Sequence, residues 1–212
     1  MTTKIGIKRT FNLHKYSSQI KDIISEWKII ATIAVSMAGM IAGTLCEKGE
    51  RGSFGEFPRI IFNYMINTDV SEIYTTFLYN LLLPTILFVV IFFCGLSAYG
   101  VLISYFIPFG YSMLIGMLTY YLYSDFMLKG LAFFVILILP FATLSLLGIV
   151  LMTVDSINMS QGVLNVLGNA NKRYPYNFSI YYKSALRNYI IIIISAIIKT
   201  ILDNLFIGIF SF

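Results

Sequence analysis

The stretch that decides the fold covers residues 73–124 and reads IYTTFLYNLLLPTILFVVIFFCGLSAYGVLISYFIPFGYSMLIGMLTYYLYS. It has no charged side chain. One helix of this length would measure about 78 Å at 1.5 Å per residue. The hydrocarbon core of a bilayer is only about 30 Å thick, so the stretch suits two crossings rather than one. Two glycines and a serine in residues 94–100 predict a tight hairpin between spans at about 77–94 and 101–123.

The composition of the whole chain points to the same environment. Of its 212 residues, 58% are hydrophobic and 12% are charged, whereas a typical soluble domain has about 25% charged residues. The mean hydropathy is +0.82. Only helices and closed barrels satisfy their backbone hydrogen bonds inside a bilayer, and the apolar runs here are continuous rather than alternating. We therefore expect an all-α, polytopic membrane bundle.

The remaining apolar runs predict about five transmembrane helices in a single domain covering residues 29–212. Residues 125–130 form a short polar turn, and residues 153–187 are polar, aromatic and basic. The last run contains two charged residues, so it either crosses or re-enters, and we favour a crossing. The predicted spans are residues 29–46, 77–94, 101–123, 131–152 and 189–210.

The segment that precedes the first span, residues 1–28, is basic and amphipathic. It predicts a cytoplasmic helix that either docks a partner or lies on the anionic inner leaflet, with Trp27 as an interfacial anchor. Lys and Arg mark the cytoplasmic side of a membrane protein. Most of them lie in this segment and in the loop after the fourth span, so we expect the N-terminus inside and the C-terminus outside. The net charge of +5 is then a matter of topology and does not indicate a nucleic-acid partner.

Small residues at helical spacing occur in the first and third spans. Gly39 and Gly43 form a GxxxG motif, and Ser112 and Gly116 have the same spacing. Such spacing lets two helix backbones approach closely. We expect packing within the chain, with a homo-oligomer as the alternative.

Prolines and an ionisable pair lie inside the predicted spans. Pro84, Pro108 and Pro140 predict helix kinks, which either surround a cavity or are static. Lys199 and Asp203 are four residues apart and share one face of the last span. They indicate either a proton or ion relay, a contact with a partner's helix, or a mutually neutralised pair facing the bundle.

Enzyme signatures are absent from the sequence. The one histidine, His14, lies in the N-terminal segment, and no clustered metal ligands or nucleotide-binding motif occur. We therefore expect no enzyme activity, no metal and no cofactor.

Three sequence elements resemble the stage II sporulation protein M family: residues 93–100 (FCGLSAYG), residues 107–116 (IPFGYSMLIG), and Lys129-Gly130 leading to Leu139-Pro140. The resemblance covers roughly residues 77–153. It implies a multi-pass protein of the bacterial plasma membrane, in contact with membrane lipid. It also implies a non-enzymatic scaffold that anchors two peptidoglycan hydrolases, stage II sporulation proteins D and P, during forespore engulfment. Other branches of the family imply the alternative, a permease or immunity subunit of a peptide, bacteriocin or ATPase-driven transport system. The family offers no catalytic residues.

Overall fold

A computed structural model of the chain describes residues 26–48, 59–60, 73–168 and 178–206, and nearly all of them are helical. Four helical stretches are long and apolar enough to cross a membrane: Glu26–Lys48, Ile73–Gly95, Gly100–Leu167 and Phe178–Phe206. The described chain is therefore an all-α bundle with the length and composition of a membrane protein. Its elements are the helix Glu26–Lys48, α3 (Ile73–Gly95), α4 (Gly100–Phe133), a π-helix η1 (Phe134–Ile138), α5 (Leu139–Gly168) and α6 (Phe178–Phe206).

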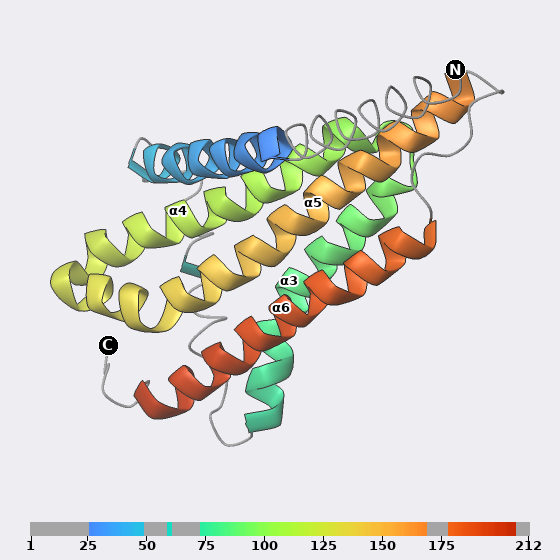
Figure 1. Ribbon diagram of the computed structural model, residues 1–212. Helices are drawn as coiled ribbons and strands as arrows, with labels where there is room; N and C mark the ends of the chain where they lie inside the picture. Colours follow the sequence, from blue (N-terminus) through green and yellow to red (C-terminus); the bar gives the residue numbers. More distant parts are fainter. Residues whose placement is uncertain (1–25, 49–58, 61–72, 169–177, 207–212) are drawn as a thin grey trace, which may run out of the picture.

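The long stretch Gly100–Leu167 turns back on itself (Figure 1). Met127 has φ 50° and ψ −128°, a backbone conformation that non-glycine residues rarely adopt. The helices before and after Met127 then run antiparallel. Ser104 shares a hydrogen bond of 2.7 Å with Ser156, and Tyr111 shares one of 2.6 Å with Ser145. The predicted turn at residues 125–130 is thus narrower than expected, because helix continues on both sides of Met127.

The apolar block of residues 73–124 breaks between α3 and α4, at the place where the sequence predicts a hairpin. The last carbonyl groups of a helix have no partner within the helix. Side chains from the other helices supply partners here. Tyr181 donates to the Phe92 oxygen (2.8 Å), and Ser160 donates to the Ser97 oxygen (2.7 Å). A Cβ on Gly100 would overlap the Cys94 oxygen, so this tight turn requires a glycine.

The helices α5 and α6 are longer than the predicted spans. The sequence suggests a polar connection over residues 153–187, but α5 continues to Gly168 and α6 begins at Phe178. Polar side chains pair across these two extensions. Asp155 accepts hydrogen bonds from Ser184 (2.6 Å) and Asn188 (2.9 Å). Hydrogen bonds between the two helices pair these polar side chains, so a polar sequence here is compatible with regular helix.

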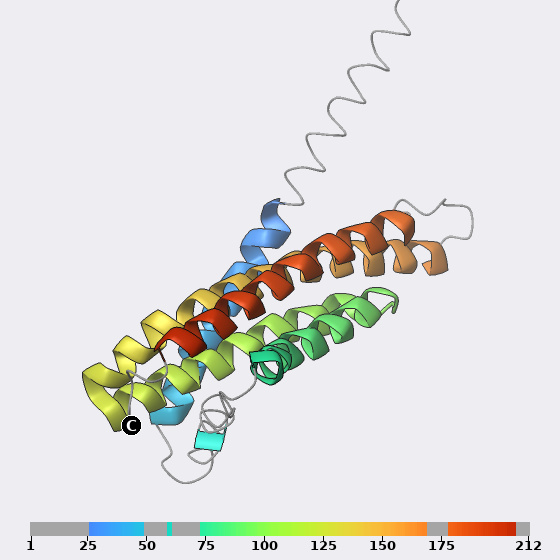
Figure 2. The same ribbon diagram turned by 90° about the horizontal axis from the view of Figure 1, so that it is seen from below.

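The centre of the bundle is α5, which packs against α3, α4 and α6. The helix Glu26–Lys48 crosses the other helices at an angle (Figure 2). One core cluster lies among α3, α4, α5 and α6 and includes Ile91, Met152 and Ile192. A second lies where α4 reverses into α5 and includes Leu122 and Leu137. Large apolar side chains also cover much of the outer surface, as expected for helices that face lipid.

Candidate functional site: a buried polar cluster between α3 and α6

The most polar part of the described interior is an ion pair on α6. The Lys199 Nζ lies 2.6 Å from Asp203 Oδ1 and 2.8 Å from Oδ2, so the ammonium contacts both carboxylate oxygens. The two residues are only 1% and 2% exposed. Their i, i+4 spacing places both on the helix face that packs into the bundle. Burial removes both charges from solvent, so each charge needs the other to stabilise it.

The neighbouring helix α3 contributes a third group to this pair. The Asn80 side-chain amide donates to Asp203 Oδ2 (3.1 Å) and to Thr200 Oγ1 (3.3 Å). We call Asn80, Lys199, Thr200 and Asp203 the polar cluster. Sequence analysis did not single out Asn80. The available signal was that it is the only amide side chain in the charge-free stretch of residues 73–124.

The polar cluster lies about two turns from the start of α3 and in the last two turns of α6. Asn80 is seven residues from Ile73, where α3 begins, and this corresponds to about 10 Å along the helix axis. One turn nearer that end, the buried Thr76 hydroxyl has no hydrogen-bond partner among the described residues. Ionisable residues buried in an apolar bundle, such as Lys199 and Asp203, are costly and are therefore candidates for function.

The groups of the polar cluster mainly satisfy one another. Three donated hydrogens reach the Asp203 carboxylate, two from the ammonium and one from the amide. No group of three or more potential metal-binding His, Cys, Asp or Glu residues occurs within the described ranges. The arrangement can neutralise a charge pair and hold α6 against α3.

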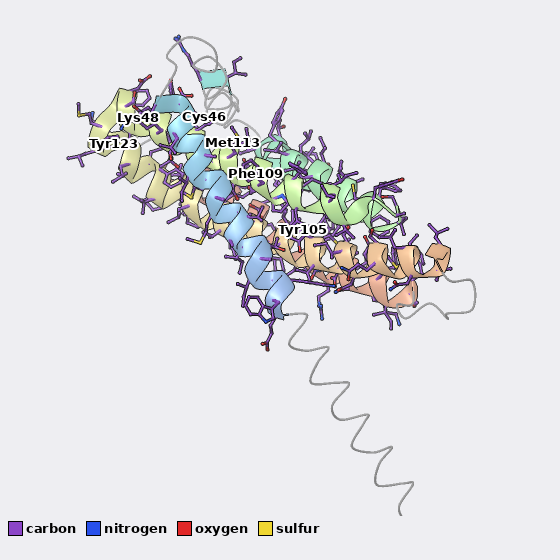
Figure 3. All side chains as sticks on the ribbon, turned by 90° about the horizontal axis from the view of Figure 1, so that it is seen from above. Cys46, Lys48, Tyr105, Phe109, Met113 and Tyr123 are labelled. Atoms are coloured by element: carbon purple, nitrogen blue, oxygen red, sulfur yellow. The ribbon has the colours of Figure 1, made fainter. Side chains whose placement is uncertain are left out.

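The glycines of the GxxxG motif lie against the backbone of α4. A Cβ on Gly39 would overlap the Phe109 oxygen, and one on Gly43 would overlap the Met113 oxygen. A glycine of α4 makes the same kind of contact with the first helix, since a Cβ on Gly116 would overlap the Met40 oxygen. Figure 3 shows the helix Glu26–Lys48 lying over the labelled Phe109 and Met113. We call this backbone approach the glycine contact, and it lies within one chain.

Ser112 and the predicted kink residues lie away from the polar cluster, and the structure does not bring them to one site. Ser112 is buried, and its hydroxyl has no partner among the described residues. Pro84 and Pro108 are buried inside α3 and α4. Pro140 is the second residue of α5 and lies two positions after the end of the π-helix η1. Because proline cannot donate to the preceding turn, a wider turn at this point is compatible with it.

Trp27, the predicted interfacial anchor, is 67% exposed at the start of the helix Glu26–Lys48. The preceding amphipathic segment, residues 1–25, and the C-terminal residues 207–212 lie outside the described residues. Most of residues 47–76, which connect the first two predicted spans, lie outside them too.

Comparison with protein-family models, with curated proteins and with solved structures finds no match to this chain.

Proposed function

We propose that this chain is a non-enzymatic, multi-pass scaffold of the bacterial plasma membrane that anchors and localises partner proteins. The observation that carries the proposal is how the buried charged side chains are bonded. Lys199, Asp203 and Asn80 bond to one another and join two helices. A bundle held together in this way offers partners a rigid and largely apolar lateral surface. By the resemblance stated above, the partners are peptidoglycan hydrolases such as stage II sporulation proteins D and P.

The proposed topology has five crossings, with the N-terminus inside and the C-terminus outside. Contacts at one end of the bundle support it. Lys28 bonds to Asn158 of α5, and Ser160 of α5 caps the α3–α4 hairpin. The start of α6, with Lys183 and Arg187, lies at this same end, because Tyr181 reaches the end of α3. Lys28, Lys183 and Arg187 therefore lie at the end assigned to the cytoplasm, which agrees with the positive-inside rule.

The helix Glu26–Lys48 is the surface that we propose for partner contact. The glycine contact occupies one of its faces, and the face that includes Met37, Ile41 and Leu45 is exposed. An exposed face of this kind suits a second membrane helix, because close packing drives helix association in lipid.

Site-specific photocrosslinking in native membranes tests this proposal. A photoreactive amino acid at Ile41 should form an adduct with a membrane-anchored cell-wall hydrolase, identified by mass spectrometry. A matched control at Leu102 of α4, which is also exposed, should give lipid adducts only. Crosslinks from Ile41 to lipid alone, with no hydrolase recovered after solubilisation, would contradict the scaffold proposal.

One observation favours the second candidate, a permease or immunity subunit. The same Lys199–Asp203 pair lies inside an apolar bundle, as do ionisable groups that carry ions or protons. This alternative requires the pair for activity. Replacing both residues by leucine should then abolish transport or immunity, and a transport ATPase should co-purify with the native chain. Full activity of the double variant would reject it.

A further inference from the structure

The first helix contacts α5 through a lysine at its cytoplasmic end. Lys28 Nζ donates to Asn158 Oδ1 at 2.5 Å and to Gln161 Oε1 at 2.6 Å. Both amide groups therefore turn their oxygens toward the ammonium. Their NH2 groups, which are donors only, point elsewhere. We call Lys28, Asn158 and Gln161 the lysine site.

The lysine site carries a positive charge that no carboxylate neutralises within the described residues. The nearest acidic residue on α5, Asp155, accepts hydrogen bonds from Ser184 and Asn188 of α6 instead. Glu26 is exposed two positions before Lys28, and residues two apart on a helix do not face each other. The ammonium is held by two neutral amide oxygens, so it keeps its positive charge, which suits an anion such as a phosphate.

The surroundings of the lysine site are those of a membrane interface. Trp27, next to Lys28, is exposed, and so are Ile30 on the same helix and Leu164 on α5. Tryptophan beside basic residues is typical of the headgroup level of a bilayer. An anion that reaches this site would therefore have apolar surface beside it.

An apolar cavity of about 140 Å³ lies deeper between the same two helices, with α4 as its third wall. Ile33 and Met37 line it from the first helix, and Leu146 and Val150 line it from α5. Val150 is eight residues from Asn158, which corresponds to about 12 Å along α5. Half of a hydrocarbon core is about 15 Å. The cavity thus begins within the half of the bilayer next to Lys28 and continues along α5 as far as Leu139, past the midplane. The end of an acyl chain whose headgroup lies at Lys28 would reach its nearer part.

We propose that the lysine site binds the phosphate of an anionic phospholipid from the surrounding inner leaflet, with one acyl chain lying over this cavity. The lipid supplies the negative charge that the lysine site lacks and covers apolar surface between the first helix and α5. The choice of the inner leaflet rests on the proposed topology, but the proposal does not depend on the scaffold function, because it concerns only the lipid that the bundle holds.

Native mass spectrometry of the full chain in detergent tests the proposal. The probes are dioleoyl-phosphatidylglycerol and dioleoyl-phosphatidylcholine at equal concentration. We expect phosphatidylglycerol to be retained preferentially, and Lys28→Gln to lower its affinity about fivefold, the effect of one basic residue near an anionic headgroup. Lys129→Gln removes the same charge near the α4–α5 reversal, at the opposite end of the bundle, and should leave the affinity unchanged.

A second variant separates binding from folding. Gln161→Glu keeps an acceptor for Lys28, so the contact between the first helix and α5 persists, but it adds a negative charge to the lysine site. We expect this variant to remain folded and to lose the preference for phosphatidylglycerol. Unchanged preference in Gln161→Glu, or equal losses in Lys28→Gln and Lys129→Gln, would overturn the proposal.

Two further probes identify the source of the phosphate. Inorganic phosphate and dihexanoyl-phosphatidylglycerol should both compete poorly with the long-chain lipid, because neither reaches the cavity. Effective competition by inorganic phosphate would show a site for free phosphate and would overturn the assignment to a lipid.

Discussion

Two helix contacts in this bundle are built from opposite kinds of residue. The contact between α3 and α6 uses polar side chains, with Asn80 reaching the Lys199–Asp203 pair. The glycine contact between the first helix and α4 uses the absence of side chains, so that Gly39 and Gly43 meet backbone oxygens directly. Apolar side chains gain little by leaving lipid for one another, so helices in a bilayer associate by hydrogen bonds or by close packing.

Because the two contacts differ, substitutions should destabilise them in two different ways. Loss of Lys199 or Asp203 leaves the other charge buried without its ionic partner. Addition of one carbon to the glycine contact pushes two backbones apart. The first failure is electrostatic and is repaired by removing the other charge, whereas the second is steric and is not.

The largest effect should come from Lys199→Leu. It leaves the Asp203 carboxylate buried with only Asn80 and should reduce the free energy of unfolding by about 3–5 kcal/mol. The double variant Lys199→Leu/Asp203→Leu should recover most of this loss, because it buries no charge. Denaturation in mixed detergent micelles measures both variants. A double variant as unstable as the single one would show that the ion pair itself stabilises the bundle.

A smaller loss is expected from Gly43→Ala in the glycine contact. The added Cβ meets backbone atoms of α4, which cannot rotate away, so the variant should lose about 1–3 kcal/mol. Gly110→Ala on α4 is the matched control, since a Cβ at Gly110 meets nothing within 4 Å. It should be neutral or stabilising by up to about 1 kcal/mol, because alanine favours helix. Equal losses in the two variants would mean that the glycines act through helix propensity and not through close packing.

Asn80→Leu should cost less than either of these changes. It removes one interhelical donor from Asp203 but leaves the ion pair, and such hydrogen bonds in membranes contribute about 0.6 kcal/mol on average and at most about 1.7. A double-mutant cycle with Thr200→Val isolates the coupling of Asn80 to Thr200. A loss as large as that of Lys199→Leu would show that Asn80 is essential for charge burial.

The smallest effect concerns a residue outside both contacts. Met127 is exposed and has a positive φ at the reversal between α4 and α5. Met127→Gly should relieve this strain and raise stability by up to about 1 kcal/mol, after the added entropy of the unfolded glycine is counted. A thermal shift in detergent checks the sign. Destabilisation would indicate that the methionine side chain contributes packing that outweighs the strain.

Much of the helical framework follows from local composition. The charge-free stretch and its small residues predict the break between α3 and α4, and i, i+4 spacing alone places Lys199 beside Asp203. The sequence did not reveal that α5 and α6 continue through the polar residues after Met152. Asp155, Ser184 and Asn188 look like loop residues until their helices are placed side by side.

The sequence by itself determined where apolar helices form, because hydropathy and helix periodicity depend on neighbours within a few turns. Only the tertiary structure decided which helix faces meet. Asn80 lies 123 residues from Asp203, and Lys28 lies 130 residues from Asn158. No local pattern links residues so far apart. Their pairing depends on how the helices cross, and the packing of the whole bundle sets those crossings.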